Sequence, residues 1–330
     1  MDRFRLDSII KLWQVYSVRA LTSINMDMRN GSQNKKQVVF IVGATGTGKS
    51  KLSIDLAKCF RAEIVNSDKM QVYQGLDIIT NKVTEEEQCG IPHHLLGVLD
   101  PNADFSVSDF CFLASRTIEL ILERGRLPIV VGGSNTYIEA LVDDEKFGFR
   151  SKYDCCFIWM DVSLEVLDSY VSKRVDQMVD AGLVDEVRNM FEPEADYNSG
   201  IRRSIGAPEM DHYIRLESSV DEETRKELLK AAIDEIKSNT YKLACRQFEK
   251  IERLHNLPCW NIHRIDATEV FLKEGRETAE LWKLIVVKPS TKIVEKFLYG
   301  RDVASTYTSV QCYHLHCIQR TAAGIYRSHC

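Results

Sequence analysis

The sequence has no long hydrophobic run, little net charge and few cysteines. Each of these properties argues against a class of protein. None of its apolar runs approaches the ~18 residues of a membrane-spanning helix, so no membrane association is expected. Its 43 Lys and Arg against 48 Asp and Glu leave a net charge of −5, which argues against a general coat for nucleic acid or anionic membranes. Ten cysteines in 330 residues, most of them inside apolar patterns, favour free thiols in a reducing compartment over a disulfide framework.

The first 36 residues lack the apolar core of a secretory signal. Met1 to Ser23 carries basic residues, hydroxyl side chains and some amphipathic character, which are typical of an organelle transit peptide. Asp2 and Asp7 argue against that interpretation, and the alternative is a solvated N-terminus. Composition alone favours neither of the two.

Alternation of strands and helices begins at Gln37. Four short runs rich in β-branched and aromatic residues have the length of buried strands, at 38–42, 63–66, 128–131 and 157–160. Amphipathic helices are predicted at 49–60 and from a capping box at Ser106 and Asp109 to Gly125. This pattern predicts an α/β fold in which a parallel sheet is flanked by helices.

Beyond Ser163 the pattern becomes mainly helical. Helices are predicted at 164–192 and 222–256, with a break near Gly200 to Pro208 and a short strand at 259–265. The chain is therefore divided into four parts, which are a flexible N-terminus at 1–36, an α/β core at 37–163, a mainly helical part at 164–300 that completes the core and the substrate site, and a tail of unknown structure at 301–330.

Between the first strand and the first helix lies the pattern Gly-x-x-x-x-Gly-Lys-Ser, formed by Gly43, Ala44, Thr45, Gly46, Thr47, Gly48, Lys49 and Ser50. The glycines let backbone amides converge on an anion, and the helix that follows adds its positive end. Lys49 supplies an ammonium group, and the Ser50 hydroxyl can ligate Mg²⁺. Since the flanking strand and helix are the context that this motif requires, we predict a phosphate or diphosphate site on a P-loop NTPase-like core.

The phosphate loop does not identify the molecule whose phosphates it holds. A GTPase needs the pattern Asn-Lys-x-Asp, and Asn81-Lys82 is followed by Val83-Thr84, so the sequence does not support that class. No Asp ends the third predicted strand, where many ATPases hold magnesium, which weakens an ATP-hydrolysing function. A small-molecule kinase, a nucleotidyl transferase and a prenyl transferase remain open.

Asp68 follows the second predicted strand and is expected at the sheet edge that carries the phosphate loop, where ligands bind in open α/β sheets. Its carboxylate could accept a proton from a substrate amine or hydroxyl, hold magnesium through water, or only cap a turn. Gly132-Gly133-Ser134 reaches the same edge from the third strand, and the Ser134 hydroxyl could bind phosphate or substrate. Four basic residues are further candidate anion contacts, although exposed Lys and Arg on helices are usually solvated: Arg202, Arg203, Lys242 and Arg246.

Two segments rich in His and Cys have the residue types of metal ligands without the spacing. His93 and His94 are adjacent, so they point in different directions, and no third ligand is spaced nearby. Cys312, His314, His316 and Cys317 lie too close together for a zinc finger, whose ligand pairs need roughly a dozen residues between them. We predict a structural role in a loop for the first segment and no zinc at the second.

Seven stretches between 37 and 265 match the pattern of a known family, and they are GATGTGKSKLS (43–53), AEIVNSDKMQVYQGLDIITNKV (62–83), IPHHLLG (91–97), LPIVVGGSNTYIEAL (127–141), RVDQMVDAGLVDEV (174–187), IRRSIGAPE (201–209) and NTYKLACRQFEKIERL (239–254). On these stretches the chain resembles the isopentenyltransferases, and among them the plant adenylate isopentenyltransferases of cytokinin biosynthesis. The second and fourth stretches are far more specific than the phosphate loop. No part of 301–330 contributes to the resemblance.

The resemblance implies transfer of the dimethylallyl group from dimethylallyl diphosphate to the exocyclic amine of adenine in free ADP or ATP, with AMP as a further acceptor. It implies that the phosphate loop, with Lys49 and a Mg²⁺ cofactor at Ser50, holds the donor diphosphate. Asp68 is then the general base on the amine, and Thr45 helps to orient that amine. Ser134, Lys242 and Arg246 match family positions near the diphosphate, and a plastid location is expected, with the cytoplasm as the alternative.

The family has a second branch, the tRNA dimethylallyltransferases, which prenylate adenosine in tRNA and carry a helical insertion between the GGxxxY and RVDxM stretches. Only 36 residues lie between Tyr137 and Arg174, and a predicted strand takes up part of that span. The resemblance therefore favours free nucleotides, and no tRNA partner is expected. The tRNA enzyme remains the alternative within the family, and a small-molecule P-loop kinase the alternative from another class. The sequence does not fix the oligomeric state, and a monomer is favoured.

Overall fold

The computed structural model of the protein describes residues 35–300. The transit-peptide interpretation of the N-terminal segment, the tail at 301–330 and the Cys/His segment at 312–317 lie outside the described residues, apart from Lys35 and Lys36. Two compact units divide the chain after Val294. Of the second unit, residues 295–300 are described, and they form the end of one helix.

One parallel sheet of six strands, in the order β3-β2-β4-β1-β5-β6, is the centre of the first unit. The strands are β1 (Lys36–Gly43), β2 (Ala62–Asn66), β3 (His93–His94), β4 (Leu127–Val131), β5 (Tyr153–Asp161) and β6 (Ile262–Asp266). The predicted parallel α/β fold is confirmed. The strands predicted at 38–42, 63–66, 128–131 and 157–160 lie within β1, β2, β4 and β5, and the strand predicted at 259–265 overlaps β6. The segment after β1 lies between the ends of β4 and β5, which is where open parallel sheets bind ligands.

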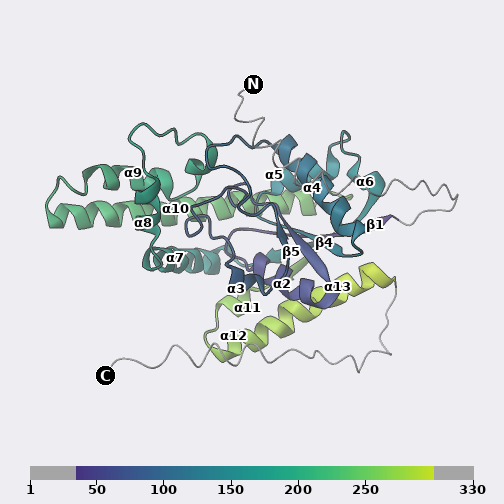
Figure 1. Ribbon diagram of the computed structural model, residues 1–330. Helices are drawn as coiled ribbons and strands as arrows, with labels where there is room; N and C mark the ends of the chain where they lie inside the picture. Colours follow the sequence, from purple (N-terminus) through teal and green to yellow (C-terminus); the bar gives the residue numbers. More distant parts are fainter. Residues whose placement is uncertain (1–34, 301–330) are drawn as a thin grey trace. The chain divides into compact units, whose positions relative to one another are not determined.

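Helices occupy most of the remaining described chain (Figure 1). They are α2 (Lys49–Phe60), α3 (Glu85–Gln88), α4 (Val107–Glu123), α5 (Asn135–Asp143), α6 (Phe149–Lys152), α7 (Leu164–Asp180), α8 (Leu183–Met190), η1 (Gly200–Arg203, a 3₁₀ turn), α9 (Ala207–Leu216), α10 (Glu222–His255), α11 (Thr268–Phe271), α12 (Arg276–Leu281), η2 (Trp282–Val287, a π-helical stretch) and α13 (Lys288–Tyr299). The predicted capping box is confirmed, since Ser106 and Asp109 exchange hydrogen bonds at the start of α4. The helix predicted at 164–192 is instead two helices, because the chain turns at Gly182 with φ of +103°.

Both faces of the sheet are buried, as the continuous apolar strands predicted. In β1, Val38, Phe40 and Val42 belong to the main core cluster with side chains of α4, α5 and α10. Val39 and Ile41 are equally buried, and because successive strand residues point to opposite faces, they meet the other layer. Figure 1 shows α4 and α5 on one side of the sheet and α2 on the other.

The long segment between β2 and α4 is fixed by residues of the helical part. Both oxygens of the Glu186 carboxylate, from α8, accept backbone hydrogen bonds at 2.9 Å, one from Ile78 and one from Ile79. The Ile79 side chain also packs on Gly206 at the start of α9, where a Cβ atom would lie 2.4 Å from Ile79 Cδ1. Gly206 has φ of +113°, so both its backbone and its surroundings require glycine.

This contact predicts that Gly206→Ala destabilises the protein more than a positive φ alone would. Gly125→Ala is the matched control, because Gly125 has φ of +65° and open space around its Cβ position. We expect the control to lower the free energy of unfolding by about 1–2 kcal/mol. The clash with Ile79 should add about 1–3 kcal/mol for Gly206→Ala. Urea denaturation of the two variants measures the difference, and equal losses would contradict the packing of Ile79 against Gly206.

Candidate active site

The phosphate loop connects β1 to α2, as the motif predicted. Lys49 is 9% exposed, and its Nζ donates a hydrogen bond of 2.6 Å to the carbonyl oxygen of Ala44. The Thr47 hydroxyl donates to the same oxygen at 2.9 Å. The lysine ammonium therefore lies over its own loop, where an anion held by the loop amides would meet it.

Burial lowers the pKa of Lys49 to about 8, since the ammonium is largely removed from water. The negative charge of Asp68 acts in the opposite direction, and the positive charge of Arg174 lowers the pKa further. Each of these effects requires proximity, so Lys49, Asp68 and Arg174 belong to one site.

Asp68 lies just beyond the carboxyl end of β2 and is held there by its own neighbours. Asn66 Oδ1 accepts from the backbone N–H of Asp68 at 3.0 Å, and Asp68 Oδ1 accepts from the backbone N–H of Met70 at 2.9 Å. Within the described part of the chain, no hydrogen bond engages Oδ2, which lies 3.5 Å from the position of a Cβ atom on Gly133. One carboxylate oxygen thus fixes the side chain, and the other is available as an acceptor.

Ser134 joins this edge from the end of β4, where it precedes α5. Its Oγ accepts a hydrogen bond of 2.9 Å from the backbone N–H of Lys69, the residue after Asp68. The structure therefore brings Ser134 and Asp68 together, although the Ser134 hydroxyl is engaged by the backbone of the Asp68 segment.

Basic side chains surround the Asp68 segment. Partial burial lowers the pKa of Lys69, and the charges of Arg203 and Arg246 lower it further, while Asp68 acts in the opposite direction. Arg203 also donates to the Tyr73 hydroxyl at 3.2 Å. Lys69 and Arg203 thus join Arg246 of α10 in one positively charged group beside the carboxylate.

Lys242 lies one helical turn before Arg246 on α10 and is exposed. Its Nζ donates to Asn239 Oδ1 at 3.3 Å. The described contacts therefore leave Lys242 on the surface of α10, with its ammonium turned to Asn239.

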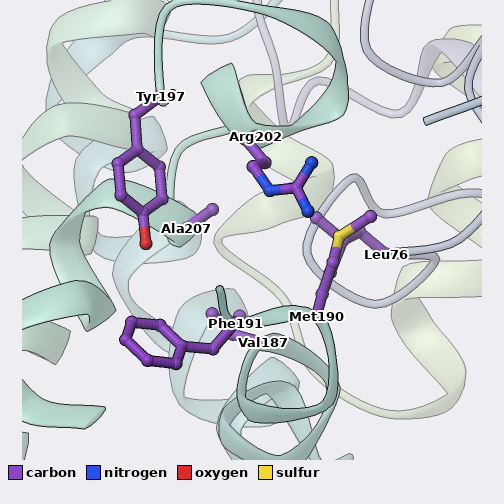
Figure 2. Close-up of a pocket in the computed structure, with 7 residues that line it drawn as sticks. All are labelled: Leu76, Val187, Met190, Phe191, Tyr197, Arg202 and Ala207. Atoms are coloured by element: carbon purple, nitrogen blue, oxygen red, sulfur yellow. The ribbon is translucent and has the colours of Figure 1, made fainter. Parts of the chain in front are cut away.

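The structure places Arg202 elsewhere. Its guanidinium forms an ion pair of 2.8 Å with Glu192 and donates to the side chain of Asn102. Figure 2 shows it at a small cavity, which is lined by Leu76, Val187, Met190, Phe191, Tyr197, Arg202 and Ala207. The tight turn of η1 thus directs Arg203 toward Tyr73 and Arg202 toward an apolar pocket, and the sequence-based grouping of Arg202 with the phosphate contacts is not seen here.

Two further residues reach the phosphate loop, and the sequence analysis did not select either. Arg174 of α7 donates from Nη2 to the Thr45 hydroxyl oxygen at 3.0 Å. Gln247 of α10 accepts from the Thr45 backbone N–H at 2.7 Å and donates to the carbonyl oxygen of Gly133 at 2.9 Å. Both lie inside the matching stretches, but one Arg or Gln on a helical face carries no signal of its own.

A magnesium ion is implied by the loop motif, and the residues present fit it only in part. Ser50 lies in the first turn of α2, and no hydrogen bond within residues 35–300 engages its hydroxyl. No cluster of three or more His, Cys, Asp or Glu residues in that range could hold a metal by itself. The fitting arrangement is therefore Ser50 together with phosphate oxygens of a ligand, which is how Mg²⁺ commonly binds.

His93 and His94 have the predicted structural role, but they lie in a short strand and not in a loop. They form β3 at the edge of the sheet, beside β2. His94 Nε2 lies 2.7 Å from Glu63 Oε2, and Arg124 contacts the same oxygen at 2.6 Å. This buried carboxylate fastens the edge strand to the sheet.

Comparison with known proteins identifies related sequences and folds. The family model for IPP transferase matches residues 71–149 and 144–253. Adenylate isopentenyltransferase 3, chloroplastic, of Arabidopsis thaliana is 55% identical over 284 residues, covering 85% of this chain and 84% of that protein. Adenylate isopentenyltransferase 5, chloroplastic, of the same plant is 58% identical over 273 residues, covering 82% of each.

Enzymes that act on tRNA are more distant relatives. tRNA dimethylallyltransferase 2 of Arabidopsis thaliana is 33% identical over 392 aligned positions, covering 83% of this chain and 84% of that protein. A crystal structure of a eukaryotic dimethylallyltransferase acting on tRNA superposes with a TM-score of 0.68 at 25% identity, covering 82% of this chain and 81% of that one. The tRNA isopentenylpyrophosphate transferase of Bacillus halodurans gives 0.62 at 29% identity, with 80% and 98% covered.

The lowered pKa of Lys49 predicts that anion binding weakens in alkaline solution. Above its pKa of about 8, a growing share of the side chain is a neutral amine that no longer attracts an anion. Affinity for inorganic diphosphate with Mg²⁺ should therefore fall by up to about tenfold per pH unit above that value. Isothermal titration calorimetry across this range measures the fall.

Lys49→Arg is the control, because a guanidinium keeps its charge throughout this pH range. Ionisation of the diphosphate itself affects both proteins equally, so the difference between their profiles isolates the lysine. Parallel profiles would contradict the assignment of Lys49 as a titrating diphosphate contact.

Proposed function

The chain belongs to the isopentenyltransferase family, and we propose that it transfers the dimethylallyl group of dimethylallyl diphosphate to the exocyclic amine of adenine in free ADP or ATP. AMP is a further acceptor under this proposal, and the product is an isopentenyladenine nucleotide for cytokinin biosynthesis. The observation that carries the proposal is the available Oδ2 of Asp68. This carboxylate lies near the phosphate loop, and its charge acts on Lys49 of that loop.

The phosphate loop is proposed to hold the donor diphosphate. As the bond between the allylic carbon and its oxygen breaks, the electron pair leaves with the diphosphate, where negative charge accumulates. Loop amides, Lys49 and Arg174 face that charge, and fixed positive groups of this kind lower the barrier to departure. A magnesium ion at Ser50 would neutralise further charge on the same group.

Asp68 is proposed to act as the general base. The lone pair of the adenine amine forms the new carbon–nitrogen bond, and positive charge grows on the nitrogen as it does so. Asp68 Oδ2 is free to accept the proton that the nitrogen then releases. The Thr45 hydroxyl oxygen accepts from Arg174 and keeps a second lone pair, which can accept a hydrogen bond from the amine N–H and orient the amine.

Two observations support free nucleotides over tRNA as the acceptor. The alignment with the tRNA enzyme of Arabidopsis runs over 392 positions although it covers 83% of a 330-residue chain, so that relative has segments which this chain lacks. In this chain, the span from Tyr137 to Arg174 is filled by α5, α6, β5 and α7, which leaves only short turns.

An organelle is the proposed location, with the plastid favoured. Adenylate isopentenyltransferases 3 and 5 of Arabidopsis are named chloroplastic, and adenylate isopentenyltransferase 7, 54% identical over 265 residues, is named mitochondrial. No helix within residues 35–300 is long and apolar enough to cross a membrane.

The proposal predicts prenylated ADP and ATP when the protein is mixed with dimethylallyl diphosphate and Mg²⁺. Mass spectrometry of parallel reactions with AMP, ADP, ATP and unmodified tRNA identifies the acceptor. Chelation of Mg²⁺ should abolish the product. Prenylated tRNA with no nucleotide product would assign the protein to the tRNA branch, and phosphorylation without prenyl transfer would indicate a kinase.

Asp68→Asn should abolish transfer while both substrates still bind. Asparagine keeps the size and one acceptor oxygen, but it cannot take the proton, and loss of a general base lowers the rate by about 10²–10⁴-fold. Turnover and both substrate affinities are measured over a series of Mg²⁺ concentrations. Asp77→Asn is the control, because Asp77 is an exposed carboxylate that pairs with Lys82. Rescue of Asp68→Asn by extra magnesium would make Asp68 a metal contact instead of the base.

A further inference from the structure

The side-chain amide of Gln247 connects two loops that are far apart in the sequence. Oε1 accepts from the backbone N–H of Thr45 at 2.7 Å, and Nε2 donates to the carbonyl oxygen of Gly133 at 2.9 Å. Gln247 lies on α10, 202 residues after Thr45 and 114 after Gly133. The ends of β1 and β4 are thus joined through a third element.

The chemistry of the two partners requires an amide at this position. A backbone N–H can only donate and a backbone carbonyl can only accept, so the bridging group must offer one acceptor and one donor side by side. An ionised carboxylate has no donor, and asparagine is shorter by one methylene group. Because both partners are backbone groups, they also fix which way the amide of Gln247 is turned.

Gly133 leaves room for the side-chain amide of Gln247. A Cβ atom on Gly133 would lie 2.5 Å from Gln247 Nε2 and 3.5 Å from Asp68 Oδ2. Residue 133 is therefore close to both Gln247 and the available oxygen of Asp68. The buried Asn135 contacts the Gln247 backbone carbonyl at 3.4 Å and holds the same turn of α10 against α5.

The two bonds set the distance between groups that the proposed reaction uses. Thr45 is held at its backbone by Gln247 and at its hydroxyl by Arg174. The Gly133 loop continues into Ser134, which holds the backbone of the residue after Asp68. We infer that Gln247 is a positioning residue, which fixes the Thr45 hydroxyl relative to the Asp68 carboxylate through its two backbone contacts. The inference rests on the proposed prenyl transfer.

The experiment compares Gln247→Met with the wild-type chain. Methionine has nearly the same length and volume and makes neither hydrogen bond, so the helix can pack while the bridge is lost. We expect kcat for transfer to ADP to fall about 10- to 100-fold, because displaced reacting groups lose rate steeply. The KM for dimethylallyl diphosphate should change less, since Lys49 and the other loop amides stay in place. Glu249→Gln, an exposed change on the same helix, should leave both values unaltered.

A second variant separates the two contacts. In Gln247→Glu the carboxylate can accept from Thr45 but faces the Gly133 carbonyl oxygen without a proton. Two charged groups adjoin this bridge: Asp68, whose Oδ2 is close to Gly133, and Arg174 of α7, which shares Thr45 with Gln247. Protonation in acid restores a donor, so kcat of Gln247→Glu relative to wild type should rise as the pH falls. A constant ratio would show that the bond to Gly133 is without effect on the reaction.

Amide hydrogen exchange tests the contact independently of activity. The Thr45 N–H should exchange about tenfold faster in Gln247→Met than in wild type, with the exchange of the sheet unchanged. Unchanged kcat in Gln247→Met, or a fall matched by loss of folded protein, would overturn the inference and leave the proposed function standing. A wild-type chain that prenylates no nucleotide would instead refute the proposed function, whatever the exchange rates show.

Discussion

A single carboxylate, Asp68, lies within electrostatic reach of three cations, and its charge offsets part of the lowering of their pKa values by burial: Lys49, Lys69 and Arg174. Removing such charges from water is unfavourable unless they are paired, and one carboxylate cannot pair with all of them. The site therefore carries an excess of positive charge at the edge of the sheet. A diphosphate, which brings concentrated negative charge to the loop, would restore the balance.

Most of this site, including the phosphate loop and Asp68, could be predicted from local sequence patterns. The phosphate loop is a continuous motif between a buried strand and an amphipathic helix, and Asp68 follows a strand, so parallel pairing alone brings both to one edge. Contacts made by isolated residues on long helices were not predictable. Gln247 lies one position after Arg246 on α10, and only the orientation of that helix decides which of them meets the loop. The side chains of the adjacent residues Arg202 and Arg203 leave a 3₁₀ turn in different directions. Sequence periodicity does not predict those directions.

The helix α10 connects the two parts into which the sequence was divided. It packs against α7 and α9, where Asn239 donates to Glu209 at 2.8 Å, and also against β1 and α5. Glu209 also accepts from the backbone N–H of Gly206 at 2.6 Å, so the start of α9 is tied to α10. The helical part therefore contacts both the segment after Asp68, through Glu186 of α8, and the phosphate loop, through Gln247 of α10. A boundary near 163 thus describes a change of pattern along the chain and not an independent unit of the fold.

The distance along the chain between Thr45 and Gln247 has a consequence for biosynthesis. A ribosome makes the phosphate loop and the first four strands well before it makes α10, since 202 residues separate the two ends of this hydrogen bond. Domains generally gain structure from the N-terminus onward during synthesis. The strands can therefore pair while the loop still lacks its partner, and a nascent chain that stops before α10 has the motif without the bond that holds Thr45. Translation through Gln247 is therefore needed to assemble the loop, because no product that stops before this residue can present both ends of the bond.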